Sequence, residues 1–279
     1  MRTAIIGMGL IGGSMALALR EKGIASSIIG VELVEDHRQK ALERGLADRM
    51  ATLEEAVDSA ELIILAMPVH AILRMLPAVL DRVSTQVVMD VGSTKQNILS
   101  AIENHRSRGR FVATHPMWGT EFSGPDAAVR GAFVNKAAVI CNREGSGADA
   151  VALVEMLYKK LGMHIVNMDS AAHDVHVAYV SHISHITSFA LANTVLEKEQ
   201  EEDAIFELAS GGFESTVRLA KSNPLTWASI FVQNRENVLD VLNEHIGQLH
   251  KFRDCLEKED VPQLEALMVN ANRIKRILK

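Results

Sequence analysis

The sequence has only two cysteines and no long apolar run, and each absence excludes kinds of protein. Cys141 and Cys255 lie far apart and show neither CxxC nor metal-ligand spacing, which predicts reduced thiols in a cytoplasmic protein. No stretch approaches the ~20 apolar residues of a membrane span. The apolar N-terminus is similar to a secretory signal, but glycines interrupt it and no small-residue cleavage site follows. We therefore interpret it as a core strand and helix.

Blocks of like charge and low-complexity tracts are lacking as well. The formal net charge of -6 is spread along the chain, so a nucleic-acid-binding surface has no electrostatic support. Hydrophobic residues at 48% and charged residues at 23% are ordinary for a globular protein, and we expect order throughout. The length of 279 residues exceeds one average domain, which favours two.

The first part of the chain alternates short β-branched runs with amphipathic segments, which is typical of βαβ units in a parallel sheet. Strands are expected at residues 3–6, 27–31, 61–66, 86–91, 110–113, 137–141 and 164–168. Helices are expected between them, at residues 10–22, 35–44, 70–80 and 148–161. Thr52 and Glu55 have the spacing of a capping box that opens a further short helix.

After residue 168 the pattern becomes almost entirely helical. Asp169 or Ser170 offers an N-cap, and only residues 210–212 and 223–224 break the pattern. We therefore expect an α/β protein, with a doubly wound sheet in residues 1–168 followed directly by an all-helical domain in residues 169–279. Apolar stripes, as in residues 227–242, exceed what one sheet domain can cover, so we expect a homodimer through these helices.

A dinucleotide-binding motif lies near the N-terminus. Gly7, Gly9 and Gly12 have GxGxxG spacing between a strand and a helix. The first allows a tight turn, the second lets the backbone approach a pyrophosphate, and the third lets helix and strand pack closely. The phosphates would lie at the helix N-terminus, beside Leu10 and Ile11.

The acid that follows the second expected strand indicates which cofactor binds. Glu32 stands 20 residues after Gly12, where an acid holds ribose hydroxyls. Its carboxylate would repel a ribose phosphate and Leu33 supplies no cation, so NAD is expected, with NADP as an alternative because His37 and Arg38 are near. A glycine turn without a ligand is the other interpretation, and it leaves the spaced glycines and the acid unexplained.

Three segments are expected at the carboxyl ends of the strands, where open α/β sheets bind their ligands. They are Met67-Pro68, expected beside the cofactor, and residues 90–95 and 114–121. His115 follows an apolar strand and precedes a proline, so its backbone should be extended and its ring can face the crevice. A neutral imidazole there could accept the proton of a substrate hydroxyl while hydride leaves the same carbon. A loop histidine bonded to backbone is the alternative.

Four more histidines lie close together in the helical half. At about 100° per residue, His173 and His176 point to nearly the opposite face from His182 and His185, so the four cannot bind one ion and no metal is expected. Small residues share the face of His182 and His185 and leave room for another chain segment or a ligand. His173 and His176 are expected to be solvated or to cap the helix.

The break at residues 210–213 is followed by Arg218. A guanidinium is a planar fork that suits a carboxylate, so we interpret Arg218 as an anion clamp. A surface ion pair with Glu214, four residues earlier, is the alternative.

Together, GMGLIGGS, HPMWGTE, SHISH and SGGF with the later arginine and tryptophan resemble the prephenate/arogenate dehydrogenase family, in the same order and over most of the chain. The resemblance implies NAD-dependent oxidative decarboxylation of a cyclohexadienyl substrate in tyrosine biosynthesis, with prephenate and arogenate both open. It implies a Rossmann-type domain and a homodimer interlocked through a helical domain.

The resemblance also assigns roles to residues. It implies that His115 accepts a hydrogen bond from the ring hydroxyl, that Ser93 orients this hydroxyl, and that Arg218 binds a substrate carboxylate. The other pocket residues that it implies are Thr120, Glu121, His182, His185, Gly212 and Trp227. Glu214-Ser215 departs from the family's Arg-Asp, which changes how the side-chain end of the substrate is recognised.

Other functions fit parts of the pattern. Pyrroline carboxylate reductases and hydroxyacid dehydrogenases share this architecture, but they lack the expected His-Pro-Met segment. A nucleotide-sensing scaffold would keep the cofactor fold without turnover, and the presence of His115, His182, His185 and Arg218 argues against it.

Overall fold

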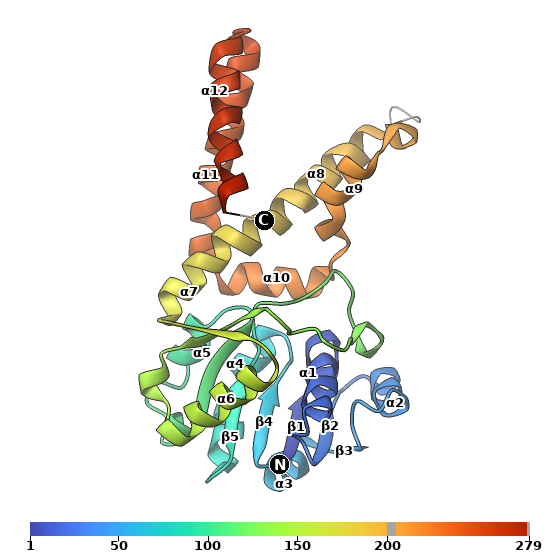
Figure 1. Cartoon of the computed structure of the whole chain (residues 1–279), viewed down its shortest axis with the longest axis vertical. Helices are drawn as coiled ribbons and strands as arrows, with labels where there is room; N and C mark the ends of the chain where they lie inside the picture. The colour runs from blue at the N-terminus through green and yellow to red at the C-terminus, as the bar shows by residue number, and fades with distance from the viewer. Residues whose placement is uncertain (200–204, 278–279) are drawn as a thin grey trace. The chain divides into compact units, whose positions relative to one another are not determined.

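The computed structural model describes residues 1–199 and 205–277, and an eight-stranded sheet forms its core (Figure 1). The strand order is β3-β2-β1-β4-β5-β6-β7-β8. The strands are β1 (Arg2–Ile6), β2 (Ser27–Val31), β3 (Arg49–Met50), β4 (Leu62–Leu65), β5 (Val87–Asp90), β6 (Phe111–Pro116), β7 (Ala137–Cys141) and β8 (His164–Met168). The seven expected strands are confirmed, whereas β3 was missed because two residues are too few to show a pattern.

The expected parallel, doubly wound sheet is confirmed, and one edge of it contains an antiparallel pair. Strands β1 to β6 are parallel, but β7 is antiparallel to β6, and β8 is parallel to β7. A parallel return needs a crossover, usually a helix. Residues 117–136 between β6 and β7 contain only a short 3-10 turn at Pro125–Ala127, so the chain returns in the opposite direction.

Helices cover both faces of the sheet, which explains the almost uninterrupted apolar strands. In β4, Leu62 and Ile64 belong to one core and Ile63 and Leu65 to the other, and all four side chains are fully buried. The first core also holds α1 (Leu10–Glu21), α2 (Glu35–Glu43) and α6 (Ala148–Lys160). The second holds α3 (Leu53–Ser59), α4 (Val69–Arg82) and α5 (Gln96–Ser100).

The helices after β8 begin with α7 (Ser170–Val177), and Asp169 caps it by accepting a hydrogen bond from Ala172 N at 2.9 Å, as expected. A π-helical turn (Ala178–His182) joins α7 to α8 (Ile183–Glu199). Helices α9 (Gly211–Val217) and α10 (Pro224–Gln233) follow. Helix α10 contacts α4, where Ser229 bonds the His70 ring at 2.8 Å, and α5, where Asn97 donates to the Gln233 carbonyl at 3.0 Å (Figure 1).

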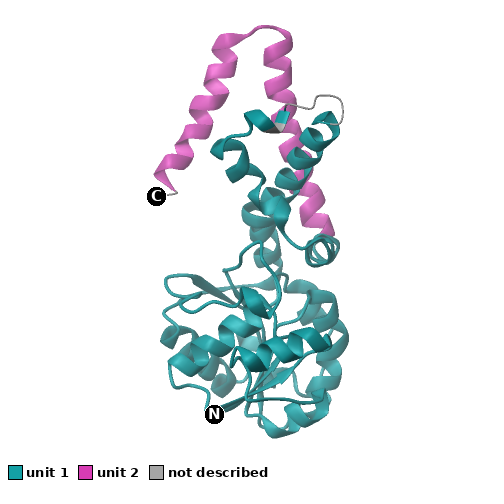
Figure 2. Cartoon of the chain, turned by 90° about the vertical axis from the view of Figure 1, so that its right-hand side faces the viewer, with its two compact units in different colours: residues 1–234 teal, residues 235–279 magenta. Residues whose placement is uncertain are grey.

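The chain divides into two compact units, residues 1–234 and 235–279 (Figure 2). The second unit is a hairpin of α11 (Arg235–Glu257) and α12 (Val261–Ala271), and Asp260 caps α12 by accepting from Gln263 N at 3.1 Å. In this division residues 169–234 belong to the same unit as the sheet. The domain boundary expected at residue 168 therefore stays a prediction. No helix among the described residues is long and apolar enough to cross a membrane.

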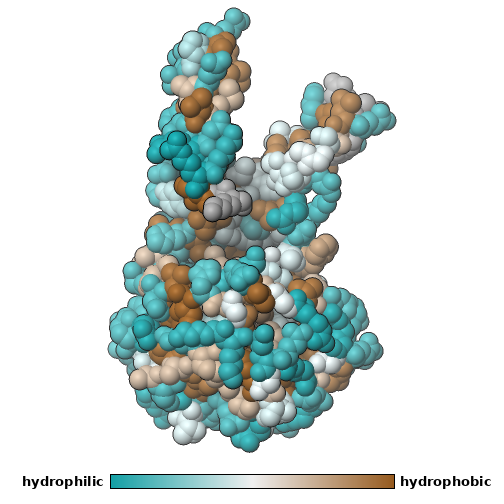
Figure 3. Space-filling view, viewed as in Figure 1, coloured by the Kyte–Doolittle hydropathy of each residue, from teal (hydrophilic) through white to brown (hydrophobic). Residues whose placement is uncertain are grey.

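Apolar side chains are exposed along the α11–α12 hairpin (Figure 3). They include Leu239, Ile246, Leu249, Leu256, Val261, Met268 and Val269. Exposed apolar surface of this extent is typical of a face that another chain covers.

The capping box before α3 gives a first prediction. Thr52 Oγ1 accepts from Glu55 N at 3.3 Å, and Glu55 Oε2 accepts from Thr52 N at 3.2 Å. Replacing Thr52 by alanine should lower the free energy of unfolding by about 1 kcal/mol, because the Glu55 N–H in the first turn loses its side-chain acceptor. Thr52→Ser should retain most of the stability. Urea unfolding of both variants measures the difference, and equal midpoints would contradict the capping role.

Candidate active site

The turn between β1 and α1 has the geometry of a phosphate cradle. Gly7 has a φ of +97°, and a Cβ there would lie 2.5 Å from the carbonyl oxygen of Ala66. A Cβ on Gly12 would lie 1.9 Å from the oxygen of Gly7. Around Gly9, by contrast, the space is open, and α1 begins at Leu10 with no side-chain cap. The first N–H groups of α1, including that of Ile11, can therefore serve an anion such as a pyrophosphate.

Glu32 lies beside this turn, as the sequence predicted. Its carboxylate accepts hydrogen bonds from three backbone N–H groups, those of Met8 at 3.1 Å, Leu33 at 2.8 Å and Val34 at 3.1 Å. The Met8 bond fixes the acid against the glycine turn, where the ribose of a dinucleotide would lie. Arg38 is one of the two residues for which NADP was left as an alternative cofactor. Its side chain forms an ion pair with Glu35 at 3.2 Å.

Met67 and Pro68 border the same turn. They directly follow Ala66, whose carbonyl lies against Gly7, and Pro68 is the N-cap of α4. Met67 packs against the core on the α3–α4 side of the sheet. The residues expected around a cofactor therefore come together at the carboxyl ends of β1, β2 and β4.

A buried ion pair holds the ends of β5 and β6. Asp90 and Lys95 are both fully buried, and Lys95 Nζ bonds the Asp90 carboxylate. Asp90 accepts from Thr114 N at 3.0 Å, and Lys95 donates to the Thr114 carbonyl at 2.8 Å. These bonds fix the backbone of Thr114, the residue before His115. Ser93 lies within the turn that the pair closes, although no contact among the described residues joins Ser93 directly to His115.

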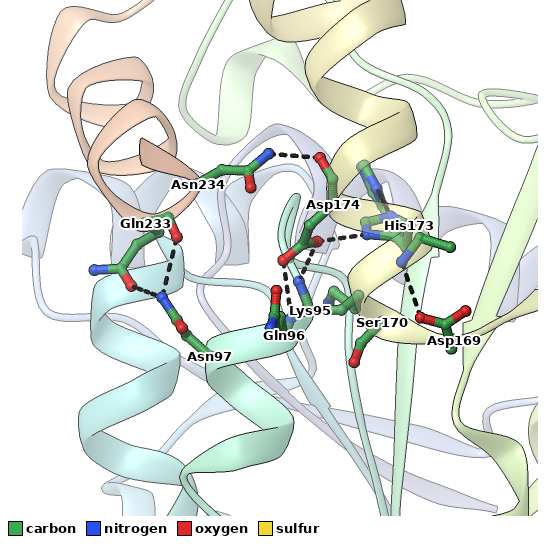
Figure 4. Close-up of polar contacts among 12 residues, drawn as sticks. Lys95, Gln96, Asn97, Asp169, Ser170, His173, Asp174, Gln233 and Asn234 are labelled. Atoms are coloured by element: carbon green, nitrogen blue, oxygen red, sulfur yellow. Dashed lines mark hydrogen bonds and ion pairs between the residues drawn. The ribbon is translucent and has the colours of Figure 1, made fainter. Parts of the chain in front are cut away.

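His115 is the first member of a chain of three polar side chains. Its Nδ1 lies 2.9 Å from His173 Nε2, and His173 Nδ1 lies 2.7 Å from Asp174 Oδ1. The Asp174 carboxylate also accepts from Lys95 N at 2.8 Å and Gln96 N at 2.9 Å (Figure 4). Helix α7 is thereby tied to the turn after β5.

The order of donors along this chain fixes the form of His115. A carboxylate only accepts, so His173 Nδ1 carries a hydrogen and donates it to Asp174. When the His173 ring carries only this hydrogen, its Nε2 accepts from the Nδ1–H of His115. The free lone pair of His115 is consequently on Nε2, which is the form needed to accept a proton.

The surroundings of His115 also favour its neutral form. The ring keeps some solvent contact, but its burial holds the pKa of His115 well below 6.5, and the positive charge of Lys95 acts in the same direction. A ring that stays neutral near pH 7 can act as an acceptor.

His115 lies within β6, opposite Val139 of β7, and not beyond the strand as expected. The extended backbone that we predicted is confirmed. The bonds of the ring to His173, rather than to backbone, argue against an ordinary loop histidine.

Two further histidines face aromatic residues of α10. His185 stacks on Trp227, with ring centroids 3.3 Å apart, and its Nδ1 donates to the Ser181 carbonyl at 3.0 Å. The His182 ring lies 6.1 Å from Trp227 and 6.4 Å from Phe231. Burial lowers the pKa of His182 to about 4 and also lowers that of His185.

The expectation that His173 is solvated is wrong, since only 1% of it is exposed. The expectation came from a uniform rotation of about 100° per residue. The π-helical turn at Ala178–His182 has more residues per turn, so residues before and after it share faces that an α-helix would separate.

An ion pair lies at the edge of this group. Arg218 Nη1 bonds Glu121 Oε2 at 2.9 Å, so the alternative pair with Glu214 is wrong. Glu214 instead lies 3.8 Å from Lys221. A backbone N–H and then Arg218 lower the pKa of Glu121. A guanidinium has five N–H donors, so Arg218 can hold Glu121 and a second carboxylate together.

Thr120 lies in the loop directly before Glu121, and Gly212 lies in the first turn of α9. The Thr120 hydroxyl accepts from Phe122 N at 3.3 Å, and the Gly212 carbonyl accepts from the hydroxyls of Ser215 and Thr216 at 2.9 Å. Ser188 of α8 donates to the Thr216 carbonyl at 3.0 Å, which ties α9 to α8.

The sequence patterns gave no role to three polar residues of the site, Lys95, Asp174 and Asn234. The signal available for Lys95 was an acid at the carboxyl end of an otherwise apolar strand, followed five residues later by a lysine. The signal available for Asp174 was a His-Asp pair near the start of a helix. Asn234 follows α10 and has no local signal of this kind.

Family models match nearly the whole chain. The nucleotide-binding domain of prephenate dehydrogenase matches residues 15–167, and the prephenate dehydrogenase dimerization domain matches residues 169–270. Prephenate dehydrogenase of Bacillus subtilis is 32% identical over 264 residues, which cover 93% of this chain and 71% of that protein.

Solved structures agree with these matches. Prephenate dehydrogenase of A. aeolicus, in complex with hydroxyphenyl propionate and NAD+, has a TM-score of 0.87 and 28% identity, covering 99% of this chain and 97% of that one. Synechocystis arogenate dehydrogenase has a TM-score of 0.77 and 29% identity, with both chains fully covered. With its nucleotide-binding sheet and helical dimerisation domain, this chain belongs to the prephenate/arogenate dehydrogenase family.

Proposed function

We propose that this protein is an NAD-dependent prephenate dehydrogenase, which converts prephenate to 4-hydroxyphenylpyruvate in tyrosine biosynthesis. The observation that carries the proposal is the chain from Asp174 through His173 to His115, because it leaves an acceptor on His115 Nε2. Arogenate dehydrogenase is the second candidate, supported by the similarity to the Synechocystis enzyme. The two buried thiols fit a reducing compartment, and we propose the cytoplasm.

In this mechanism His115 accepts the proton of the ring hydroxyl at Nε2. The electrons of the O–H bond form a C=O bond as the hydride leaves its carbon. The electron pair of the ring–carboxylate bond then enters the ring as carbon dioxide leaves, and the C=O electrons return to the oxygen. The oxygen regains the proton from His115, so the aromatic product is a phenol. NAD, when bound, supplies the hydride acceptor. Since aromatisation drives the reaction, the protein mainly orients the substrate and receives the proton.

The other residues have positioning and binding roles in the proposal. His173 and Asp174 hold the His115 ring and stabilise the charge that it gains, and Ser93 orients the hydroxyl. Arg218 binds a substrate carboxylate, with Glu121 and Thr120 beside it. His182, His185, Gly212 and Trp227 line the remainder of the pocket. Gly7, Gly9 and Gly12 hold the dinucleotide together with Glu32. We place the boundary between the nucleotide-binding domain and the helical domain at residue 168.

The proposal predicts the preferred cofactor. With prephenate, the catalytic efficiency with NAD should exceed that with NADP by about tenfold or more, since the Glu32 carboxylate repels a ribose phosphate. Glu32→Gln should reduce this preference, while the control Glu35→Gln should leave the NAD rate near that of the wild type. Steady-state assays with prephenate and arogenate measure both preferences. An equal rate with NADP would contradict the assigned role of Glu32, and no turnover of either substrate would refute the function.

His115 and Arg218 should affect different kinetic constants. His115→Asn should lower kcat about 10²–10⁴-fold with little change in KM, because the proton acceptor acts only as the bond breaks. Arg218→Ala should instead raise KM roughly tenfold or more, since a carboxylate is bound in both ground and transition states. Arg218→Lys keeps the positive charge but loses the planar guanidinium. Its KM should lie between those of the wild type and Arg218→Ala. Near-normal turnover of His115→Asn would make the histidine structural.

The dependence of kcat/KM on pH should also identify His115 as the proton acceptor. Neutral His115 is the active form, so kcat/KM falls as pH decreases through its pKa, which lies below 6.5. His115→Asn should lose this acidic limb. An unchanged limb in the variant would assign it to another group.

Finally, we propose a homodimer formed through the helical domain, supported by the exposed apolar residues of α11 and α12 and by the dimerization-domain match. Light scattering at micromolar concentration should give about twice the 30.5 kDa chain mass. Leu249→Glu and Val269→Glu together should shift the mass toward one chain, while Lys251→Glu, on the same hairpin, should not. A fully active monomer of the wild type would contradict the proposal.

A further inference from the structure

Asn234 is a buried polar residue to which the proposed mechanism gives no role. It directly follows α10, and 4% of it is exposed. Its Nδ2 lies 2.7 Å from the Asp174 carbonyl and 3.2 Å from His182 Nδ1 (Figure 4 shows the first contact). One amide group therefore contacts both the residue that anchors His173 and a second histidine of the candidate pocket.

The chemistry of these contacts fixes which atom donates. A carbonyl oxygen can only accept, so the amide nitrogen of Asn234, and not its oxygen, must face Asp174. The same nitrogen carries a second hydrogen, which is available to His182 Nδ1. A ring nitrogen that accepts a hydrogen bond has no hydrogen of its own, so the hydrogen of neutral His182 is on Nε2.

We infer that Asn234 is a positioning residue that fixes His182 in the Nε2–H tautomer, so that His182 offers a neutral hydrogen-bond donor to an anionic substrate. The identity of the substrate rests on the proposed function, whereas the tautomer does not. His185 has the opposite form, because its Nδ1–H donates to the Ser181 carbonyl and leaves an acceptor on Nε2. The two histidines thus present one donor and one acceptor next to Trp227.

The environment of His182 supports a fixed neutral tautomer. Burial lowers its pKa to about 4, although the negative charge of Asp174 acts in the opposite direction. His182 therefore stays uncharged near neutral pH, and the choice between its two neutral forms is left to its hydrogen-bond partner.

The direct test is the tautomer in the full-length wild-type protein. Long-range ¹H–¹⁵N spectra of histidine-labelled protein, with His182 assigned by His182→Gln, should show the Nε2–H form at neutral pH with or without prephenate. A Nδ1–H form or an imidazolium would overturn the inference. This measurement needs no turnover, so its failure is distinct from failure of the proposed function.

The second test is Asn234→Asp, which keeps the shape and removes the donor. A carboxylate next to Nδ1 should attract a hydrogen to it, so the His182 spectrum should change to an Nδ1–H or charged form. KM for prephenate should rise about tenfold, with a smaller change in kcat. Asn97→Asp is the matched control, because it alters another asparagine contact of the α10 C-terminus and should leave the His182 spectrum unchanged.

A double-mutant cycle separates positioning from a merely structural role. In a His182→Gln background, Asn234→Asp should cause no further rise in KM, because its effect passes through the missing ring. A KM effect of the same size in both backgrounds would overturn the inference.

Discussion

The site depends first on the carboxylate of Asp174. This carboxylate accepts hydrogen bonds from backbone N–H groups of the turn after β5 and from the His173 ring. The backbone carbonyl of Asp174 accepts a further hydrogen bond from Asn234, directly after α10. Three segments that are distant in the sequence therefore meet at one residue that is 2% exposed. Removing a buried acid of this kind leaves several donors without partners, which is far more costly than losing a surface ion pair.

The buried Asp90–Lys95 pair has a related role at the ends of the strands. Two fully buried charges are tolerated only when each is hydrogen-bonded as well as paired, and here the additional partners are the backbone groups of Thr114 and Gly92. The same lysine contributes a positive charge near His115. The Asp90–Lys95 pair thus holds the ends of the strands together and also favours the neutral form of the proposed proton acceptor.

Local patterns predicted most of the fold. The apolar runs gave seven strands because both faces of the sheet are covered, and the capping signals at Thr52 and Asp169 are local by nature. The reversal of β7 could not be predicted in this way, because strand direction depends on where a long connection leads. The two residues of β3 are ordered by their neighbour β2 and have no pattern of their own.

The candidate site was predictable where residues stand in a motif. The glycine turn with Glu32 follows from residues that the sequence singled out. Glu121 and Arg218 were also named from the sequence, but the ion pair between them was not predicted. His173 was misjudged because its position depends on the pitch of a helix, and Asn234 was missed because its partners are 52 and 60 residues away.

The π-helical turn also limits how this protein can vary. Removing one of the five residues in Ala178–His182 would allow an ordinary α-helix, which rotates everything after it by about 100°. His185, Ser188 and the attachment of α9 through Thr216 would then face away from their partners. The length of this turn is therefore under stricter constraint than its composition, and related sequences should differ here by substitution while keeping the same number of residues.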